Sequence, residues 1–536
     1  MGNNLIDVAG ESARSGSFLA FGMSLATAIL AIGSIVAARL LGPDLYGQYT
    51  LVLVGPQLLF LFTDLGINQG IIKLTANLRS QGDNDRASRI INTGIFLRIL
   101  AGTVLSITLY VFAEPFASVL LNRPEMYSYL QITAILILFQ ALYSTAVSSF
   151  VGVDRAEFSA VTSNLQAVTR TLVTIVLLLL GFNLLGAFAG NILGYAISGI
   201  CGIVILKLVL PKRKESASST SLKGDTKALM LYGMPIFATF LFTGFTPLYQ
   251  NMILAHFTTD AAIGNFKAAL NFATTLTLLS FPITTALLSG FSKLDSNIKE
   301  NLSAFFKLAN KYTSLLVFPV IMLLIIFSSE IVQIIYGATY DTAALYLALY
   351  CLLYFVAGIG YLNLASFYNG IGETKTTFKI GALTFALVAL LSPIFAFFFE
   401  VPGLIAAFLI ANVAGTSYGA YIAKTKHKVE FSMSTVGRVF VASALSVIPT
   451  ILLRLAGLQS YYILIAGSLI YLFSYLLFVP LMNIVTEPEL DSARFIIQRI
   501  GPLKIVAIKA LDLEQKIMHL TLSIKRQRNA SSIEKS

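Results

Sequence analysis

The sequence predicts an all-α integral membrane protein with about 14 transmembrane helices. Of its 536 residues, 56% are hydrophobic and only 12% are charged, and the mean hydropathy is +0.80. A soluble domain carries about twice that share of charged residues. The apolar runs are continuous over roughly 20 residues and do not alternate, which excludes a membrane β-barrel. The chain is therefore expected to cross the membrane many times as helices.

The apolar runs divide the chain into fourteen expected spans. The second begins after a turn at Gly42-Pro43-Asp44. Tight hairpins are expected at Gly181-Phe182-Asn183, between spans 5 and 6, and at Glu400-Val401-Pro402-Gly403, between spans 11 and 12. The expected spans are 16–38, 46–72, 89–112, 128–150, 158–181, 184–207, 229–255, 261–289, 303–327, 343–369, 377–399, 403–423, 436–456 and 460–483.

The Lys and Arg residues predict the orientation of these spans. The even-numbered connections carry twenty of them, and the odd-numbered connections carry only Arg39, Arg123 and Arg454. Because cytoplasmic loops of membrane proteins are enriched in Lys and Arg, both termini are expected in the cytoplasm. The same rule explains the net charge of +11, so nucleic acid is not expected as a partner.

Two halves of the chain resemble each other. Leu45–Tyr49, which enters span 2, is matched by Ala262–Phe266, which enters span 8. Gly152 and Gly370 follow spans 4 and 10, and Asn191 and Asn412 lie in spans 6 and 12. The expected organisation is an N-lobe with spans 1–6 (1–210), a cytoplasmic linker (211–228), a C-lobe with spans 7–12 (229–424), spans 13 and 14 (425–484), and a cytoplasmic amphipathic helix with a tail (485–536).

Polar side chains follow a helical period inside several spans. Arg98, Arg170 and Lys267 lie within spans 3, 5 and 8, and Asp64 lies within span 2. Charged residues inside a membrane are costly and usually mark a functional site. Three cations against one acid favour a positive, water-filled cleft for an anionic headgroup, and a structural Asp64–Arg98 pair is the alternative. The candidate cleft residues are Arg170, Lys267, Asn271, Gln250, Asn68, Gln57 and Arg98, and Asp64 is the candidate for ion coupling.

The sequence offers no pattern for catalysis or metal binding. Its three histidines stand in unrelated contexts, and Cys201 and Cys351 both lie in apolar runs. Zinc sites and catalytic triads therefore have no support. There is no phosphate-binding loop, so any driving force is expected from an H⁺ or Na⁺ gradient or from the membrane potential. The protein is not expected to be an enzyme or to hold a cofactor.

Several segments carry a family resemblance. ARLLGPDLYGQYTLV, TDLGINQG, LYGMPIF, IGNFKAA and YNGIGETKTTF resemble the polysaccharide-exporter branch of the MOP superfamily, which holds Wzx-type flippases and is related to lipid II flippases and MATE exporters. The resemblance implies two six-helix lobes around a central cleft lined by spans 1, 2, 7 and 8, and transport by alternating access. It places Asp64, Asn68, Gln250, Lys267 and Asn271 on cleft-lining helices. Clefts of this family often carry arginines, whereas span 8 here offers a lysine.

The expected function is a flippase that moves a polyprenyl-(pyro)phosphate-linked oligosaccharide from the inner to the outer leaflet of the cell membrane. Its partners would be this substrate and membrane lipids, with glycan-assembly enzymes as further candidates. A MATE-like exporter of organic cations is the alternative, although it would need more acidic cleft residues than Asp64. A membrane glycosyltransferase is a third reading, but the short odd-numbered loops hold no acidic cluster. A non-transporting scaffold would leave the charges within the spans unexplained.

Overall fold

The computed structural model describes residues 2–210, 222–294, 298–454 and 459–497, with two helical fragments at 511–512 and 515–516. Every regular element within these ranges is a helix. Eight helices there are long and apolar enough to cross a membrane, or up to ten if each of two bent helix pairs forms one span. The all-α membrane fold is therefore confirmed, and the count of fourteen stays a prediction.

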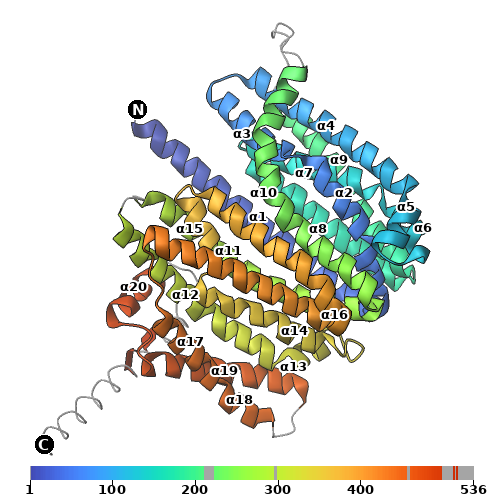
Figure 1. Cartoon of the computed structure of the whole chain (residues 1–536). Coiled ribbons are helices and arrows are strands. Elements are labelled where there is room, and N and C mark those ends of the chain that lie inside the picture. Colours follow the sequence, from blue (N-terminus) through green and yellow to red (C-terminus); the bar gives the residue numbers. More distant parts are fainter. Residues whose placement is uncertain are drawn as a thin grey trace, which may run out of the picture. The chain divides into compact units, whose positions relative to one another are not determined.

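The chain forms two compact units, and each contains segments from distant parts of the sequence. The first unit comprises Met1–Asn271, Ile335–Ala343 and Gly381–Phe408. Its core includes Ile71, Ile91, Phe150 and Leu229, all fully buried. Figure 1 labels the α-helices of this unit. Its helices are α1 (Gly2–Val52), α2 (Val54–Asp64), α3 (Ile67–Ser80), α4 (Asn84–Val111), α5 (Ala113–Pro115), η1 (Phe116–Leu120), η2 (Pro124–Met126), α6 (Tyr127–Thr133), α7 (Leu136–Gly152), α8 (Ala156–Leu179), α9 (Asn183–Val209), α10 (Leu222–Phe257), the first part of α11 (Asp260–Lys293) and the middle part of α16 (Thr374–His427).

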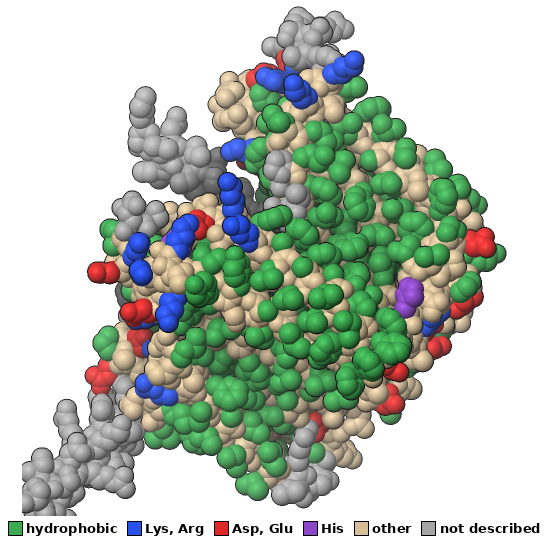
Figure 2. Space-filling view, in the orientation of Figure 1, with side chains coloured by type: hydrophobic (Ala, Val, Ile, Leu, Met, Phe, Trp, Pro, Cys, Tyr) green, Lys and Arg blue, Asp and Glu red, His purple; other side chains and the backbone are tan. Residues whose placement is uncertain are grey.

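The outer face of α4 shows why this unit needs a lipid environment. Phe96, Leu100, Val104 and Ile107 are 51%, 51%, 52% and 58% exposed, and they recur every three or four residues along one helical face. Figure 2 shows hydrophobic side chains covering α4 and α10, with Lys and Arg gathered at the end of the unit where α10 begins. An apolar stripe of this kind is stable against lipid tails and unfavourable against water.

The second expected span is not one continuous helix. Gly42 adopts φ 75° and ψ 169° inside α1, where the sequence predicted a turn. The range 46–72 was expected to be one helix, but α2 ends at Asp64, and Leu65 and Gly66 adopt positive φ values of 44° and 80° before α3 begins. Hydropathy reports how apolar a segment is and does not report its backbone angles, so the break was missed. As a result, Asp64 ends one short helix and Asn68 lies in the first turn of the next.

Two pairs of glycines bring helix backbones of the first unit together. A Cβ atom at Gly47 would lie 1.8 Å from the carbonyl oxygen of Asp260, and one at Gly264 would lie 1.8 Å from that of Pro43. A Cβ atom at Gly66 would similarly lie 2.1 Å from the carbonyl oxygen of Gly233. Gly47 and Gly264 belong to the two matched motifs that enter spans 2 and 8, so equivalent positions of the two halves face each other.

Alanine at Gly47 or Gly264 is expected to destabilise the protein by about 1–3 kcal/mol, because the obstructing atoms are backbone atoms that can yield only if a helix shifts. Gly437→Ala is the matched control, because its Cβ atom would meet nothing within 4 Å in α17. That control should be neutral or stabilising by about 0.5–1 kcal/mol. Thermal unfolding in detergent, followed by circular dichroism, measures the difference. Equal melting temperatures for all three variants would contradict the tight contact.

The second unit comprises Phe272–Ile334, Ala344–Ile380 and Leu409–Ser536. Its core is aromatic: the rings of Phe291, Phe306 and Phe367 contact one another, and Tyr368 packs beside them. Its helices are the rest of α11, α12 (Lys299–Ile326), α13 (Ser328–Ile335), α14 (Ala343–Cys351), η3 (Leu352–Ile359), α15 (Leu364–Gly370), the two ends of α16 (Thr374–His427), α17 (Met433–Leu445), α18 (Val447–Arg454), α19 (Ser460–Leu481) and α20 (Glu487–Ile497).

The backbone supports the predicted internal repeat. Three successive amides starting at Val153 donate to the carbonyls of Ser149, Val151 and Phe150. The three amides starting at Ile371 repeat this pattern with the carbonyls of Phe367, Asn369 and Tyr368. Every donor and acceptor of the second set lies 218 positions after its counterpart in the first (371 − 153). The middle residue of each turn, Asp154 or Gly372, has a positive φ of 56° or 82°. This register pairs Arg155 with Glu373 and Gly152 with Gly370.

The helix before each of these turns is also bent in both halves. Spans 4 and 10 were expected to be continuous helices. The structure bends the first by 40° between Pro124–Thr133 and Leu136–Gly152, and the second by 43° between Ala343–Ile359 and Leu364–Gly370. The two expected hairpins are present, with Gly181 and Asn183 at φ 86° and 44° and Glu400 at φ 50°. Most of the linker (211–221) and of the C-terminal tail after Ile497 lies outside the described residues.

Candidate substrate site

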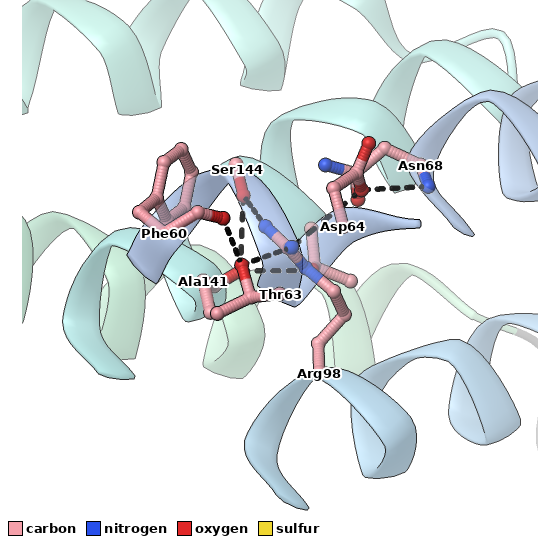
Figure 3. A network of polar contacts seen from close by, with 8 residues as sticks. Phe60, Thr63, Asp64, Asn68, Arg98, Ala141 and Ser144 are labelled. Atoms are coloured by element: carbon pink, nitrogen blue, oxygen red, sulfur yellow. Dashed lines mark hydrogen bonds and ion pairs between the residues drawn. The ribbon is translucent and has the colours of Figure 1, made fainter. Parts of the chain in front are cut away.

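Arg98 is the most deeply buried charge of the first unit, and hydroxyl groups hold its guanidinium in place. Its side chain is 0% exposed. Nε donates to Thr145 Oγ1 at 3.2 Å, and the terminal nitrogens donate to Thr63 Oγ1 and Ser144 Oγ. The guanidinium also lies 5.3 Å from the ring centre of Phe60. Figure 3 shows these contacts converging from α2, α4 and α7. All three guanidinium nitrogens therefore have partners within the protein.

Asp64 supplies the opposite charge beside this arginine. Its Oδ1 atom lies 3.6 Å from Arg98 Nη1 and accepts a hydrogen bond of 3.2 Å from the backbone amide of Asn68, across the break between α2 and α3. The carboxylate is 30% exposed (Figure 3). It is thus the open member of the pair, and an ion or a proton could reach it while Arg98 stays enclosed. The structure contains the Asp64–Arg98 contact that was the structural alternative.

A second cluster forms around Arg170 on α8. Arg170 Nη2 donates to the hydroxyl of Tyr49 at 3.3 Å, and Asn191 Nδ2 on α9 donates to the same hydroxyl. Gly194 makes room for the arginine, because a Cβ atom there would lie 2.7 Å from Arg170 Cβ. Asn191, noted in the sequence, and Gly194 therefore act together: they let α9 pack tightly on α8 beside the charge.

Lys267 and Asn271 bring α11 to the same cluster. Lys267 lies close enough to Arg170 for the two cations to interact electrostatically. Asn271, one helical turn further on, donates from Nδ2 to the hydroxyls of Tyr46 at 3.0 Å and Tyr336 at 3.2 Å. The Tyr46 hydroxyl also lies 2.9 Å from Ser34 Oγ. These hydrogen bonds form a network that joins α1, α11 and the segment after α13.

A small cavity lies beside the Arg170 side chain. Its volume is about 20 Å³, which is enough for about one water molecule. Arg170 and the polar side chains that line it can therefore keep one hydrogen-bonding partner in place inside the membrane. The lining residues are Leu30, Gly33, Ser34, Ala37, Tyr46, Tyr49, Arg170, Thr171 and Thr174.

The two clusters differ in their balance of charge. Arg98 has Asp64 as a counter-charge. Within the described part of the chain, neither Arg170 nor Lys267 contacts a carboxylate. Besides Lys267, the groups that interact with Arg170 are the tyrosines Tyr46, Tyr49 and Tyr195. Adjacent cations repel each other in a low dielectric, and an anion between them removes that cost. Arg170 and Lys267 together are therefore suited to hold a phosphate-type anion.

The remaining candidates from the sequence have no described hydrogen bond or ion pair with this cation pair. Gln250 on α10 is buried, and its Nε2 has no hydrogen-bond partner among the described residues. The Oδ1 atom of Asn68 is also buried and unpartnered within those residues. Gln57 is exposed on α2. The assignment of these three residues to the substrate cleft stays a prediction.

Sequence reasoning missed the tyrosines that surround the cation pair. Tyr46 and Tyr49 were noted only as part of the repeated entry motif, and Tyr336 was placed in a loop. The available signal was their position: two tyrosines of a matched motif, three residues apart, at the entrance of a span that contains a charge. A phenol can donate to an anion and still pack against apolar side chains.

Comparison with known families identifies the lineage of this chain. Residues 36–345 match the family described as "Polysaccharide biosynthesis protein". The chain belongs to this family. The match covers both clusters described above, from the end of α1 through α11 and the segment that carries Tyr336. The resemblance to the polysaccharide-exporter branch of the MOP superfamily is thereby confirmed. No curated protein sequence matches the chain significantly.

Three solved structures with this fold are a flippase and two transporters. The chain is similar to the lipid II flippase MurJ in an inward closed conformation, with a TM-score of 0.70 and 18% identity over 87% of this chain and 98% of MurJ. An inward-facing multidrug resistance MATE transporter of the MOP superfamily has a TM-score of 0.62 and 17% identity over 75% of this chain and 94% of the transporter. A MOP superfamily transporter from Pyrococcus furiosus with a binding pocket of reverse polarity has a TM-score of 0.55 and 15% identity over 77% of this chain and 96% of that transporter.

The chain therefore belongs to a family of polysaccharide biosynthesis proteins and has the fold that MurJ and MATE transporters share. Identities of 15–18% establish the fold, so the substrate has to be argued from the residues of this chain. Arg170 and Lys267 lie inside the first unit, and neither contacts a carboxylate among the described residues.

Proposed function

We propose that the protein flips a polyprenyl-(pyro)phosphate-linked oligosaccharide from the inner to the outer leaflet of the membrane by alternating access. The position of Arg170 and Lys267 at one network carries this proposal. Arg170 donates to the hydroxyl of Tyr49, whose ring stacks on Tyr46, and Tyr46 accepts a hydrogen bond from Asn271, one helical turn beyond Lys267. Neither cation contacts a carboxylate within the described residues. Phosphate oxygens form charge-assisted hydrogen bonds with both side chains. The two cations bind the headgroup in the protein while the lipid tail stays in the bilayer, so the polar part of the substrate never crosses hydrocarbon alone.

A MATE-like exporter of organic cations is the alternative transporter with the same fold. A cationic substrate requires an excess of carboxylates in the site, which lowers the cost of removing the cation from water. Asp64 is already opposite Arg98 at 3.6 Å, and the cluster around Arg170 contributes phenols and amides. An organic cation placed there would meet two positive charges. The sign of the site therefore favours the anionic lipid.

We further propose that Asp64 couples transport to an H⁺ or Na⁺ gradient. Its carboxylate is 30% exposed beside an enclosed arginine, and it ends a broken membrane helix. Protonation or ion binding at Asp64 weakens its attraction to Arg98, which changes the stability of the break between α2 and α3. The protein is proposed to lie in the cell membrane with both termini in the cytoplasm and to receive its substrate from glycan-assembly enzymes.

Reconstitution of the purified protein in liposomes tests the substrate class. A fluorescent polyprenyl-pyrophosphate-linked oligosaccharide is placed in both leaflets, and the fraction that an added glycosidase can reach is followed over time. Protein-containing liposomes should expose essentially all of the lipid, and empty liposomes about half. A lipid with the same tail and glycan but a neutral linkage should move much more slowly, because it offers no charge to Arg170 and Lys267.

Two results would overturn the proposal. One is equal transport of the neutral and the pyrophosphate-linked lipids, which would remove the role of the cation pair. The other is uptake of an organic cation such as ethidium without flipping of either lipid, which would identify the exporter. Running the assay with an imposed H⁺ gradient and then with a Na⁺ gradient, for wild type and Asp64→Asn, shows which ion drives transport.

A further inference from the structure

The segment Ile335–Ala343, here called the strap, belongs to a different compact unit from its surroundings in the chain. Ser328–Ile334 before it and Ala344–Ile380 after it belong to the second unit, whereas the strap belongs to the first. Tyr336 and Tyr340 are 2% and 1% exposed, and their ring centres lie 5.0 Å apart. Connecting loops usually run over the protein surface, whereas this nine-residue connection packs two fully buried tyrosines into the first unit.

Hydrogen bonds tie the strap to α1 and α11 along its length. Tyr340 donates to the carbonyl of Ala38 at 2.6 Å, and Arg39 Nη1 donates to that of Ile335 at 3.3 Å. On the α11 side, Tyr336 donates to the carbonyl of Ala268 at 3.3 Å, and the amide of Ala343 donates to Asn265 Oδ1 at 3.1 Å. The strap therefore bridges the end of α1 and the start of α11 within the first unit.

The strap also contacts the residues around the cation pair. Asn271, one turn beyond Lys267, donates to Tyr336 and to Tyr46, and Tyr46 lines the small cavity beside Arg170. The strap thus reaches the residues around the cation pair from the side where α1 turns at Gly42 and α11 begins. That side carries the odd-numbered connections, which are poor in Lys and Arg, so it is the side predicted to face outward.

We propose that the strap Ile335–Ala343 is the outer closure of the Arg170–Lys267 site and that it must leave its place before a bound headgroup can reach the outer leaflet; this inference rests on the proposed function. The division into units supplies the means of opening. Because the strap packs with the first unit and continues at both ends into the second, any movement between the units pulls on it. Gly337, at φ 91°, gives the strap a turn next to Tyr336 that side chains rarely allow.

The strap opens only when the hydrogen bonds of its tyrosine hydroxyls break, so these bonds determine the rate of opening. Tyr336 and Tyr340 each hold one backbone carbonyl of a helix. Removing the Tyr340 hydroxyl leaves its ring packed on Tyr336 and releases only the carbonyl of Ala38. The variant Tyr340→Phe should therefore open the strap more often without removing it. Tyr336→Ala with Tyr340→Ala should leave the outer side open.

Accessibility of a single cysteine tests this closure without any substrate. Cys201 and Cys351 are free cysteines and are first replaced by alanine. Ser34→Cys then places a thiol beside Tyr46 at the cavity. Intact expressing cells are treated with a membrane-impermeant methanethiosulfonate, which reaches the protein from outside only. Labelling should be slow with the strap intact, about five-fold faster in Tyr340→Phe, as expected for one hydrogen bond, and faster still in the double alanine variant.

Tyr471→Phe is the matched control, because it removes a fully buried phenol that donates to the carbonyl of Ser443 at 3.1 Å in the second unit. It should leave the labelling rate unchanged. Labelling of detergent-unfolded protein confirms that the thiol reacts in every variant, and Tyr340→Phe keeps the test valid if the double alanine variant does not fold. Fast labelling with an intact strap, or equal slow labelling in all variants, would overturn the closure.

The outcome separates the closure from the proposed function. If labelling depends on the strap but the oligosaccharide lipid is not flipped in liposomes, the closure stands and the substrate assignment fails. If the lipid is flipped and labelling is insensitive to Tyr336 and Tyr340, the function stands and the closure fails.

Discussion

Replacing Arg170 and Lys267 together by alanine is expected to abolish flipping of the pyrophosphate-linked lipid, with a loss of at least about 100-fold in rate, since each charged hydrogen bond to phosphate contributes about 1.5–3 kcal/mol. Each single substitution should cost about ten-fold or more on the same reasoning. The physical reason is that the headgroup then enters a membrane cavity without a compensating charge. The liposome assay with glycosidase detection measures these rates.

Arg155→Ala is the matched control for these variants. Arg155 is an exposed cation, 56% accessible, whose ion pair with Glu157 at 3.3 Å lies outside the cluster. It should flip lipid at the wild-type rate. Lys267→Arg keeps the charge and should retain most of the activity, whereas an unchanged rate in Arg170→Ala and Lys267→Ala would remove the basis of the proposed function. Circular dichroism confirms that each variant remains folded.

Arg98→Leu is expected to destabilise the protein by about 3–5 kcal/mol, the usual cost of removing one partner of a buried ion pair. The substitution leaves Asp64 without a counter-charge and leaves three hydroxyls, on Thr63, Thr145 and Ser144, without their common donor. Because Asp64 is 30% exposed, water offsets part of this cost, so the lower end of the range is expected. The chain contains no Trp, so thermal unfolding is followed by circular dichroism.

The double variant Arg98→Leu with Asp64→Asn separates charge from packing. It removes the uncompensated carboxylate, so it should be more stable than Arg98→Leu alone. Arg98→Lys should remain intermediate, because an ammonium keeps the charge but cannot reproduce the planar arrangement that reaches all three hydroxyls. If Arg98→Leu melts at the wild-type temperature, the buried contacts in Figure 3 do not stabilise the first unit.

The amino-acid sequence was sufficient to predict the fold class. Long apolar runs permit only helices in a membrane, and charges within such runs must pair or line a cavity. This reasoning singled out Arg170 and Lys267 from different spans, and their role as substrate contacts stays a prediction. The Asp64–Arg98 contact was foreseen as an alternative, because a lone acid inside the membrane has few possible partners.

The parts that could not be predicted depend on backbone geometry and on long-range packing. The break at Leu65 and Gly66 lies within an apolar run and leaves no mark on hydropathy. Tyr336 and Tyr340 belong to a connection between spans, where sequence patterns indicate neither burial nor a partner. The contact of Tyr340 with Ala38, 302 positions away, exists only once the chain has folded.

The contact between Gly47 and Gly264 limits which substitutions the two positions can accept during evolution. The two glycines occupy equivalent positions of the two matched halves, 217 residues apart (264 − 47), and each leaves no room for a side chain on the other's helix. In a chain with two such halves, the backbone of each half limits which side chains fit at the equivalent position of the other. A side chain gained at either position can be kept only if the opposite copy moves its backbone, so the halves can drift apart freely elsewhere but must change in step here.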